Sequence, residues 1–72
     1  MEQIYIQKGQ ALYYEYDNAS GSIANIIDNE PILFNITKYE SVGAFHIAFN
    51  LNGCFIQIWA KKYDIRKIGK DE

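Results

Sequence analysis

The sequence predicts a mostly β protein, a small antiparallel sheet or barrel of five to six strands, made from two hairpins and one short helical segment. One reason is composition: twelve Ile, six Tyr, four Phe and one Trp among 72 residues favour strands over helices. Another is Asn52-Gly53, which separates two runs of alternating apolar residues. The length leaves room for one hydrophobic core, so we expect a single domain over residues 1–68 and a frayed tail over residues 69–72.

The clearest element is a hairpin formed by residues 44–51 and 54–61. In a two-residue turn both residues have positive φ, which suits Asn52 and Gly53 and fixes the pairing of the flanking strands. A slip by one residue would mix the two faces, so the pairing is specific. The apolar face pairs Leu51 with Cys54, Phe49 with Ile56, Ile47 with Ile58 and Phe45 with Ala60, and the other face pairs Asn50 with Phe55, Ala48 with Gln57 and His46 with Trp59.

A second hairpin is predicted at the N-terminus, where residues 3–7 and 11–16 flank Lys8-Gly9-Gln10. Cross-strand pairs of aromatic and aliphatic side chains stabilise a hairpin of this type. The expected pairing sets Ile6 opposite Leu12 and Ile4 opposite Tyr14, and it leaves Tyr5 and Tyr13 together on the other face.

Between the hairpins the predicted elements are short. Residues 17–22 are small and polar and predict a loop. Ser22 can cap one or two helical turns over residues 23–27, and a short strand is the competing interpretation. A turn over residues 28–31 follows, in which proline opens the next element.

A strand over residues 32–37 is predicted from the alternation of Ile32, Phe34 and Ile36. Residues 38–43 then turn the chain into the C-terminal hairpin. The strands either curl into a small barrel or form one sheet beneath the helical turn. A last, short edge strand is predicted with Tyr63, Ile65 and Ile68.

The cellular location is predicted from the absence of disulfide-forming, signal-peptide and membrane-spanning features in the sequence. Cys54 is the only cysteine, which excludes an internal disulfide. The first residues have neither the basic start nor the apolar stretch of a signal peptide, and no apolar run is long enough to cross a bilayer. We therefore expect a cytoplasmic protein with no membrane partner.

The sequence contains no recognisable catalytic apparatus. Cys54 and His46 are the obvious nucleophile and base, but the hairpin pairing puts them on opposite faces and about 17 Å apart. Carboxylate pairs such as Glu15 and Asp17 face solvent, where they have no reason to act as a general acid. One cysteine and one histidine cannot build a metal site. We therefore expect no enzymatic activity, no cofactor and no metal ion.

The candidate partner-binding site consists of His46, Phe55, Gln57 and Trp59. These four side chains share the hairpin face opposite the apolar one, and they combine aromatic area with polar groups. Trp59 has a second interpretation as ordinary core, covered by the helical turn or by the N-terminal hairpin.

A candidate nucleic-acid-binding site is the basic cluster of Lys61, Lys62, Tyr63, Arg66 and Lys67. In this interpretation the cations hold phosphates and the tyrosine stacks on a base. The competing interpretation is an edge strand that its lysines protect from aggregation. The preceding part of the chain holds two basic and six acidic side chains, a balance of −4, which argues against nucleic acid as a partner.

Two functions follow from these sites. The first is a non-catalytic protein-interaction module, an inhibitor, adaptor or regulatory subunit that binds a larger protein through the aromatic-polar face. A chain this small gains little net stability from its own core, which leaves homodimer formation open. Its heavy use of Ile, Asn, Lys and Tyr is typical of AT-rich genomes, including those of phages and mobile elements. The alternative, and the weaker of the two, is a small β barrel that binds single-stranded nucleic acid through the basic C-terminal segment.

Overall fold

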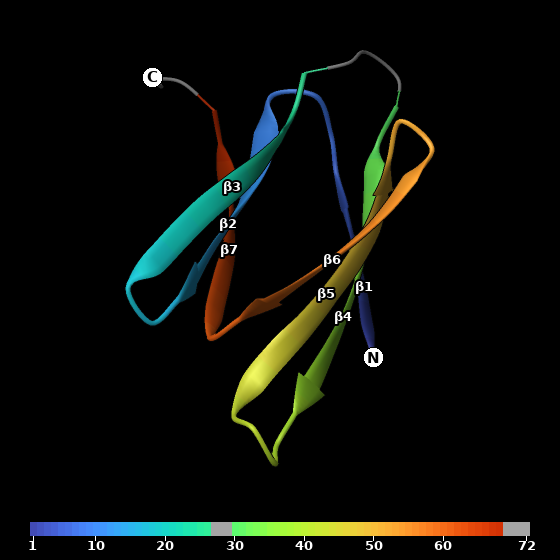
Figure 1. Ribbon diagram of the computed structural model, residues 1–72. Helices are drawn as coiled ribbons and strands as arrows, with labels where there is room; N and C mark the ends of the chain where they lie inside the picture. Colours follow the sequence, from blue (N-terminus) through green and yellow to red (C-terminus); the bar gives the residue numbers. More distant parts are fainter. Residues whose placement is uncertain (27–29, 69–72) are drawn as a thin grey trace.

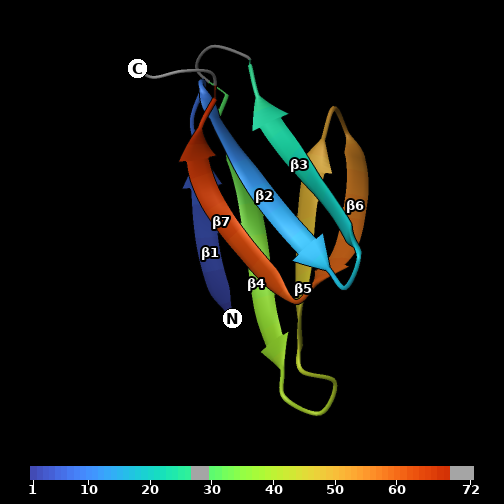
Figure 2. The same ribbon diagram turned by 90° about the vertical axis from the view of Figure 1, so that its left-hand side faces the viewer.

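The computed structural model describes residues 1–26 and 30–68, which form seven strands and no helix. The strands are β1 (Glu2–Ile6), β2 (Gln10–Tyr16), β3 (Ala19–Asn25), β4 (Ile32–Tyr39), β5 (Ala44–Leu51), β6 (Cys54–Ala60) and β7 (Lys62–Lys67). They make two antiparallel sheets, one with the order β1-β4-β5-β6 and one with the order β3-β2-β7. Figure 1 shows the two sheets as separate layers, and Figure 2 shows the three-stranded sheet in front of the four-stranded one.

The mostly β, antiparallel class predicted from the sequence is confirmed, with differences in its construction. The described residues build two facing sheets rather than one sheet or a barrel, and they form seven strands rather than five or six. In the part of the chain that the structure describes, no helix is long and apolar enough to span a membrane. Residues 27–29, which the predicted helix and turn include, lie outside the described residues, as does the predicted tail of residues 69–72.

The helical segment predicted after Ser22 is wrong, and so is the loop predicted over residues 17–22. Only Asp17 and Asn18 form a turn, with Asp17 at a φ of 53°, and β3 follows directly. β3 pairs with β2 at seven successive positions. These cross-strand contacts outweigh the loop preference of the small polar residues in β3, because strand preference depends mainly on the neighbours that a strand finds. The competing strand interpretation is correct for this segment.

The C-terminal hairpin has the predicted pairing. Asn52 and Gly53 have φ values of 52° and 81°, and β5 pairs with β6 at all seven predicted positions. The strand predicted over residues 32–37 is confirmed as β4, which continues to Tyr39. The predicted edge strand is confirmed as β7, which pairs with β2 at one edge of the three-stranded sheet and includes Tyr63 and Ile65 but ends before Ile68.

The predicted N-terminal hairpin is wrong, because β1 and β2 belong to different sheets. β1 pairs with β4, which sets Ile6 opposite Ile32, and β2 pairs with β3 and β7. In the connection where the chain passes from the sheet of β1 to the sheet of β2, Gly9 has a φ of 88° and donates its N–H to the carbonyl of Asn25 at 2.9 Å. Ile6 and Leu12 are both fully buried, but they come from opposite sheets. A strand with alternating apolar residues buries one face whether β1 pairs with β2 or with β4, so the alternation could not predict which strand is the partner of β1.

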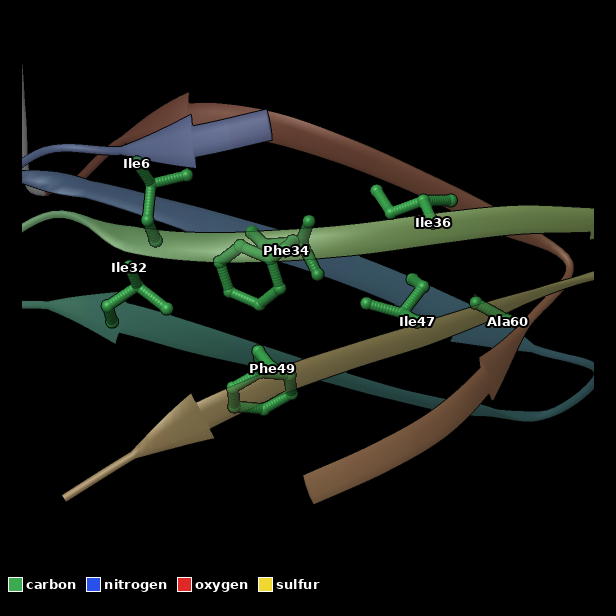
Figure 3. Packing of buried hydrophobic residues seen from close by; sticks show 8 residues of the cluster. Ile6, Ile32, Phe34, Ile36, Ile47, Phe49 and Ala60 are labelled. Carbon is green, nitrogen blue, oxygen red and sulfur yellow. The ribbon is translucent and has the colours of Figure 1, made fainter. Parts of the chain in front are cut away.

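The hydrophobic core lies between the two sheets (Figure 3). Phe34 of β4 and Phe49 of β5 make ring contact there, with centroids 4.8 Å apart. Asn25 is a buried polar side chain, and its Nδ2 donates to the carbonyls of Ile6 at 3.1 Å and Glu30 at 2.7 Å. It therefore connects β3 to the end of β1 and to the segment before β4. The core cluster consists of Ile6, Leu12, Ile32, Phe34, Ile36, Ile47, Phe49 and Ala60.

Candidate functional site on the outer face of the four-stranded sheet

The four-stranded sheet has one face on the core and one face turned away from it, here termed the outer face. Because side chains alternate along a strand, the outer face can be assigned from the register and from the buried residues. It carries Gln3 and Tyr5 of β1, Leu33, Asn35, Thr37 and Tyr39 of β4, Ala44, His46, Ala48 and Asn50 of β5, and Phe55, Gln57 and Trp59 of β6. None of these side chains is an Asp, Glu, Lys or Arg, so the outer face has no formal charge while its histidine is neutral.

The four residues of the predicted partner-binding site all lie on this outer face. Phe55 is 62% exposed and Trp59 is 46% exposed, while Gln57 is exposed and His46 is half-buried. Trp59 is therefore a surface residue rather than core. The two elements expected to cover it do not exist as predicted, because the helical segment is a strand and the N-terminal hairpin is divided between the sheets.

Three rings gather at one end of the outer face. The ring centroids of Trp59 and His46 are 5.0 Å apart, those of Trp59 and Tyr39 are 5.4 Å apart, and those of Tyr39 and His46 are 6.3 Å apart. All three contacts have edge-to-face geometry, which aromatic pairs prefer. Sequence reasoning missed Tyr39 because it assigned residues 38–43 to a turn. The signal was present, since Tyr39 continues the outward alternation of β4.

Two hydrogen bonds between side chains fix the polar part of the outer face. His46 Nε2 and Gln57 Oε1 share one at 2.9 Å, across β5 and β6. Gln3 Nε2 donates to Asn35 Oδ1 at 2.9 Å, across β1 and β4. The outer face thus offers aromatic rings, amides and an imidazole, with no charged side chain to repel a partner of either sign.

The basic cluster consists of residues of β7, in the other sheet, and of Lys61, which lies between β6 and β7, and it is largely paired with acidic groups. Lys61 Nζ lies 3.6 Å from Asp17 Oδ1, Lys62 Nζ lies 4.0 Å from Glu15 Oε1, and Arg66 Nε donates to Asp64 Oδ2 at 3.0 Å. The guanidinium of Arg66 also stacks 4.5 Å from the ring centroid of Tyr13. Lys67 ends β7 and is exposed. Three of the four cations thus lie beside a carboxylate of the same chain.

Tyr63 does not share a face with Lys62 and Arg66, because it points toward the core side of β7. Its hydroxyl donates to Glu2 Oε1 at 2.9 Å, and its ring meets Phe45 edge to face at 5.0 Å. Burial, followed by the hydrogen bond and the negative charge of Glu2, raises the pKa of the Tyr63 phenol above its usual value. The ring is therefore engaged within the chain rather than presented for stacking.

The residues considered for catalysis are placed as the hairpin pairing requires. Cys54 is an exposed free cysteine beside the turn, whereas His46 lies five positions further along the ladder on the opposite face. Among residues 1–26 and 30–68, no group of three or more His, Cys, Asp or Glu side chains could hold a metal ion. The chain matches no protein-family model, and searches found no significant similarity to a curated protein or to a solved structure.

Proposed function

We propose that this protein is a non-catalytic protein-interaction module, an inhibitor, adaptor or regulatory subunit that binds a larger protein through the outer face of its four-stranded sheet. The observation that carries the proposal is an uncharged sheet face on which Phe55 is 62% exposed and Trp59 is 46% exposed. An exposed sheet face of a small protein is normally polar and charged. Exposed rings surrounded by amides are instead typical of residues that dominate protein–protein interfaces.

The outer face is also prepared for binding at low entropic cost. The ring of Trp59 already contacts Tyr39 and His46, and the amide of Gln57 is held by His46. Side chains that are ordered before binding lose little freedom when a partner arrives. A partner with apolar groups opposite the rings and hydrogen-bonding groups opposite the amides would fit this surface.

The basic cluster gives less support to binding of single-stranded nucleic acid. Acidic partners lie beside three of its cations, and Tyr63 is hydrogen-bonded to Glu2 on the core side. The chain also carries a net charge of −2, which opposes binding to a polyanion. The outer face is therefore the better candidate for the functional surface.

The test is capture of partners from lysate by the tagged protein, with nuclease present, followed by affinity measurement on the captured protein. The variant is Phe55→Ala with Trp59→Ala. Each ring is expected to contribute about 2 kcal/mol, roughly 30-fold in affinity. Circular dichroism and dispersed amide resonances verify that the variant remains folded.

The matched control is Lys62→Gln with Lys67→Gln, which changes the exposed surface of the other sheet. It should leave affinity for a protein partner within about threefold. A folded Phe55/Trp59 variant that still binds with full affinity contradicts the proposal. Loss of all captured material on nuclease treatment, together with loss of binding in the lysine variant, would establish the nucleic-acid interpretation instead.

A further inference from the structure

The two sheets have four edge strands, and three of them are protected against pairing with another chain. β7 carries Lys62, Asp64 and Arg66 in alternation, β1 is a five-residue strand that begins with Glu2, and β3 contains Gly21 between two serines. Charge, short length and glycine all weaken an edge as a template. β6 differs, because its seven residues include no charged residue, no glycine and no proline.

The backbone of β6 is open along its outer side from Phe55 to Trp59, and the open stretch ends at Lys61, whose N–H donates to the carbonyl of Glu15 in β2 at 2.7 Å. In a hairpin closed by Asn52-Gly53, the pair nearest the turn is hydrogen-bonded and the pairs then alternate. The N–H and C=O groups of Phe55, Gln57 and Trp59 therefore point away from β5. Among the described residues none of these three has a backbone hydrogen bond to another element. Figure 2 shows β6 at the side of its sheet with no strand beyond it.

We propose that β6 pairs antiparallel with β6 of a second copy of this chain, with a two-fold axis at Gln57. Three residues with outward N–H and C=O groups at steps of two form a set that is complementary to itself when reversed. In this pairing Gln57 faces Gln57 of the partner subunit, and Phe55 faces Trp59 of the partner subunit. Ile56 then faces Ile58 of the partner subunit on the core side.

A second copy fits this edge better than an arbitrary strand. The paired segments contain no charged side chain, so the reversed alignment creates no like-charge contact. Each aromatic residue meets another aromatic residue, and each isoleucine meets an isoleucine. The contact is isologous, so the β6 edge of each copy is occupied by the other copy, and the assembly stops at a dimer instead of extending into larger oligomers. The two outer faces then join into one surface, and the dimer goes beyond the proposed function without being required for it.

The size of the contact predicts a weak dimer. Seven strand residues are roughly 23 Å long, and an edge contact of that length buries less than the about 1,200 Å² typical of stable complexes. The dissociation constant is therefore expected between about 1 µM and about 1 mM. Sedimentation equilibrium from about 10 µM to about 2 mM should show a transition from one chain to two, with no larger species.

The decisive variant removes one hydrogen-bond donor from the proposed contact. The Gln57 N–H points away from β5, so Gln57→Pro removes it without breaking the β5–β6 ladder. N-methylation of Gln57 does the same with the side chain intact, and Gly53-Cys54 is a suitable junction for ligating synthetic halves. Either change should weaken the dimer at least about tenfold. Gln57→Ala is the matched control, because it keeps the N–H and should still dimerise.

Disulfide trapping provides an independent readout. Facing residues in a hydrogen-bonded antiparallel pair have Cα atoms about 5.5 Å apart, within reach of a disulfide. Under an added mild oxidant, Cys54→Ser with Gln57→Cys should form a covalent dimer in which one S–S bond forms and both thiols are oxidised. Cys54→Ser with Ser22→Cys, on the other sheet, should not.

Amide hydrogen exchange completes the test. Exchange at Phe55, Gln57 and Trp59 should slow as protein concentration rises, since all three amides donate across the proposed contact. A protein that stays monomeric at about 2 mM overturns the proposal. So does a dimer that N-methylation leaves unchanged, or a series of larger oligomers. Each of these results leaves the outer face free to bind a different protein, so failure here is distinguishable from failure of the proposed function.

Discussion

Replacing Gly21 with alanine should destabilise the protein, although Gly21 lies in a strand of ordinary backbone conformation. Gly21 pairs with Tyr14 across β3 and β2, and the tyrosine ring lies over the glycine. A Cβ atom at this position would lie 2.6 Å from Tyr14 Oη, 2.7 Å from Cζ and 3.3 Å from Cε1. These distances are far inside van der Waals contact, so the ring would have to move.

The expected magnitude is the difference between two effects. Overfilling a well-filled site costs about 1–3 kcal/mol, and Tyr14 has little room to move because it contacts the core cluster. Alanine in a strand otherwise gains about 0.5–1 kcal/mol over glycine in conformational entropy. Taking the midpoint of each range, about 2 and about 0.75 kcal/mol, the net loss in unfolding free energy is about 1 kcal/mol. For a domain of this size that lowers Tm by roughly 4–8 °C.

The assay is urea unfolding of a double-mutant cycle at low protein concentration, where association does not contribute. Tyr14→Val removes the ring and keeps a side chain that suits a strand. In that background Gly21→Ala should cost nothing or should stabilise the protein by about 0.5 kcal/mol. Ser22→Ala, exposed on the same strand, is the control and should stay within about 0.5 kcal/mol of wild type. Equal effects of Gly21→Ala in both backgrounds would refute the reasoning.

Two further predictions concern contacts that join the sheets. Asn25→Ala should lower the unfolding free energy by about 2–4 kcal/mol in urea denaturation. The reason is that the carbonyls of Ile6 and Glu30 both lose a hydrogen-bond donor, and the bond to Ile6 is buried. A loss below about 1 kcal/mol would contradict this prediction. The raised pKa of Tyr63 means that the folded state favours the neutral phenol. The stability that the neutral Tyr63 phenol contributes is therefore complete below the unfolded pKa of about 10, and it is lost as pH rises through the folded pKa. Ultraviolet difference titration of the wild type against Tyr63→Phe should therefore show one tyrosine that ionises at higher pH than the others. Glu2→Gln should lower the pKa of Tyr63. If Tyr63 ionises together with the exposed tyrosines, the assignment is refuted.

The C-terminal hairpin shows how far local signals can determine structure. Asn52 and Gly53 adopt positive φ at little cost, and a two-residue turn leaves one register for the strands beside it. That register also places His46, Phe55, Gln57 and Trp59 on one face, so the composition of the candidate site was predictable from the sequence. Its exposure was not, because exposure depends on what the rest of the chain places over it.

The N-terminal half shows where local signals fail. Alternation in β1 and β2 requires each strand to bury one face, but it does not specify the neighbouring strand. β1 pairs with β4, about thirty residues further along the chain, and in the connection from β1 to β2 the N–H of Gly9 donates to the carbonyl of Asn25. In β3, the small and polar residues favour a loop locally, and pairing with β2 overrides that preference.

The sequence by itself determined the β class, the antiparallel C-terminal hairpin, the buried alternation of β4 and the presence of an edge strand near the C-terminus. Each of these depends on turn chemistry or on periodicity within a few residues. Only the tertiary structure decided that the strands divide into two sheets, that Tyr39 joins the aromatic cluster, and that β6 is an edge strand. The physical reason is that strand partners are chosen by burial and backbone hydrogen bonding between distant segments, and no local pattern carries that choice.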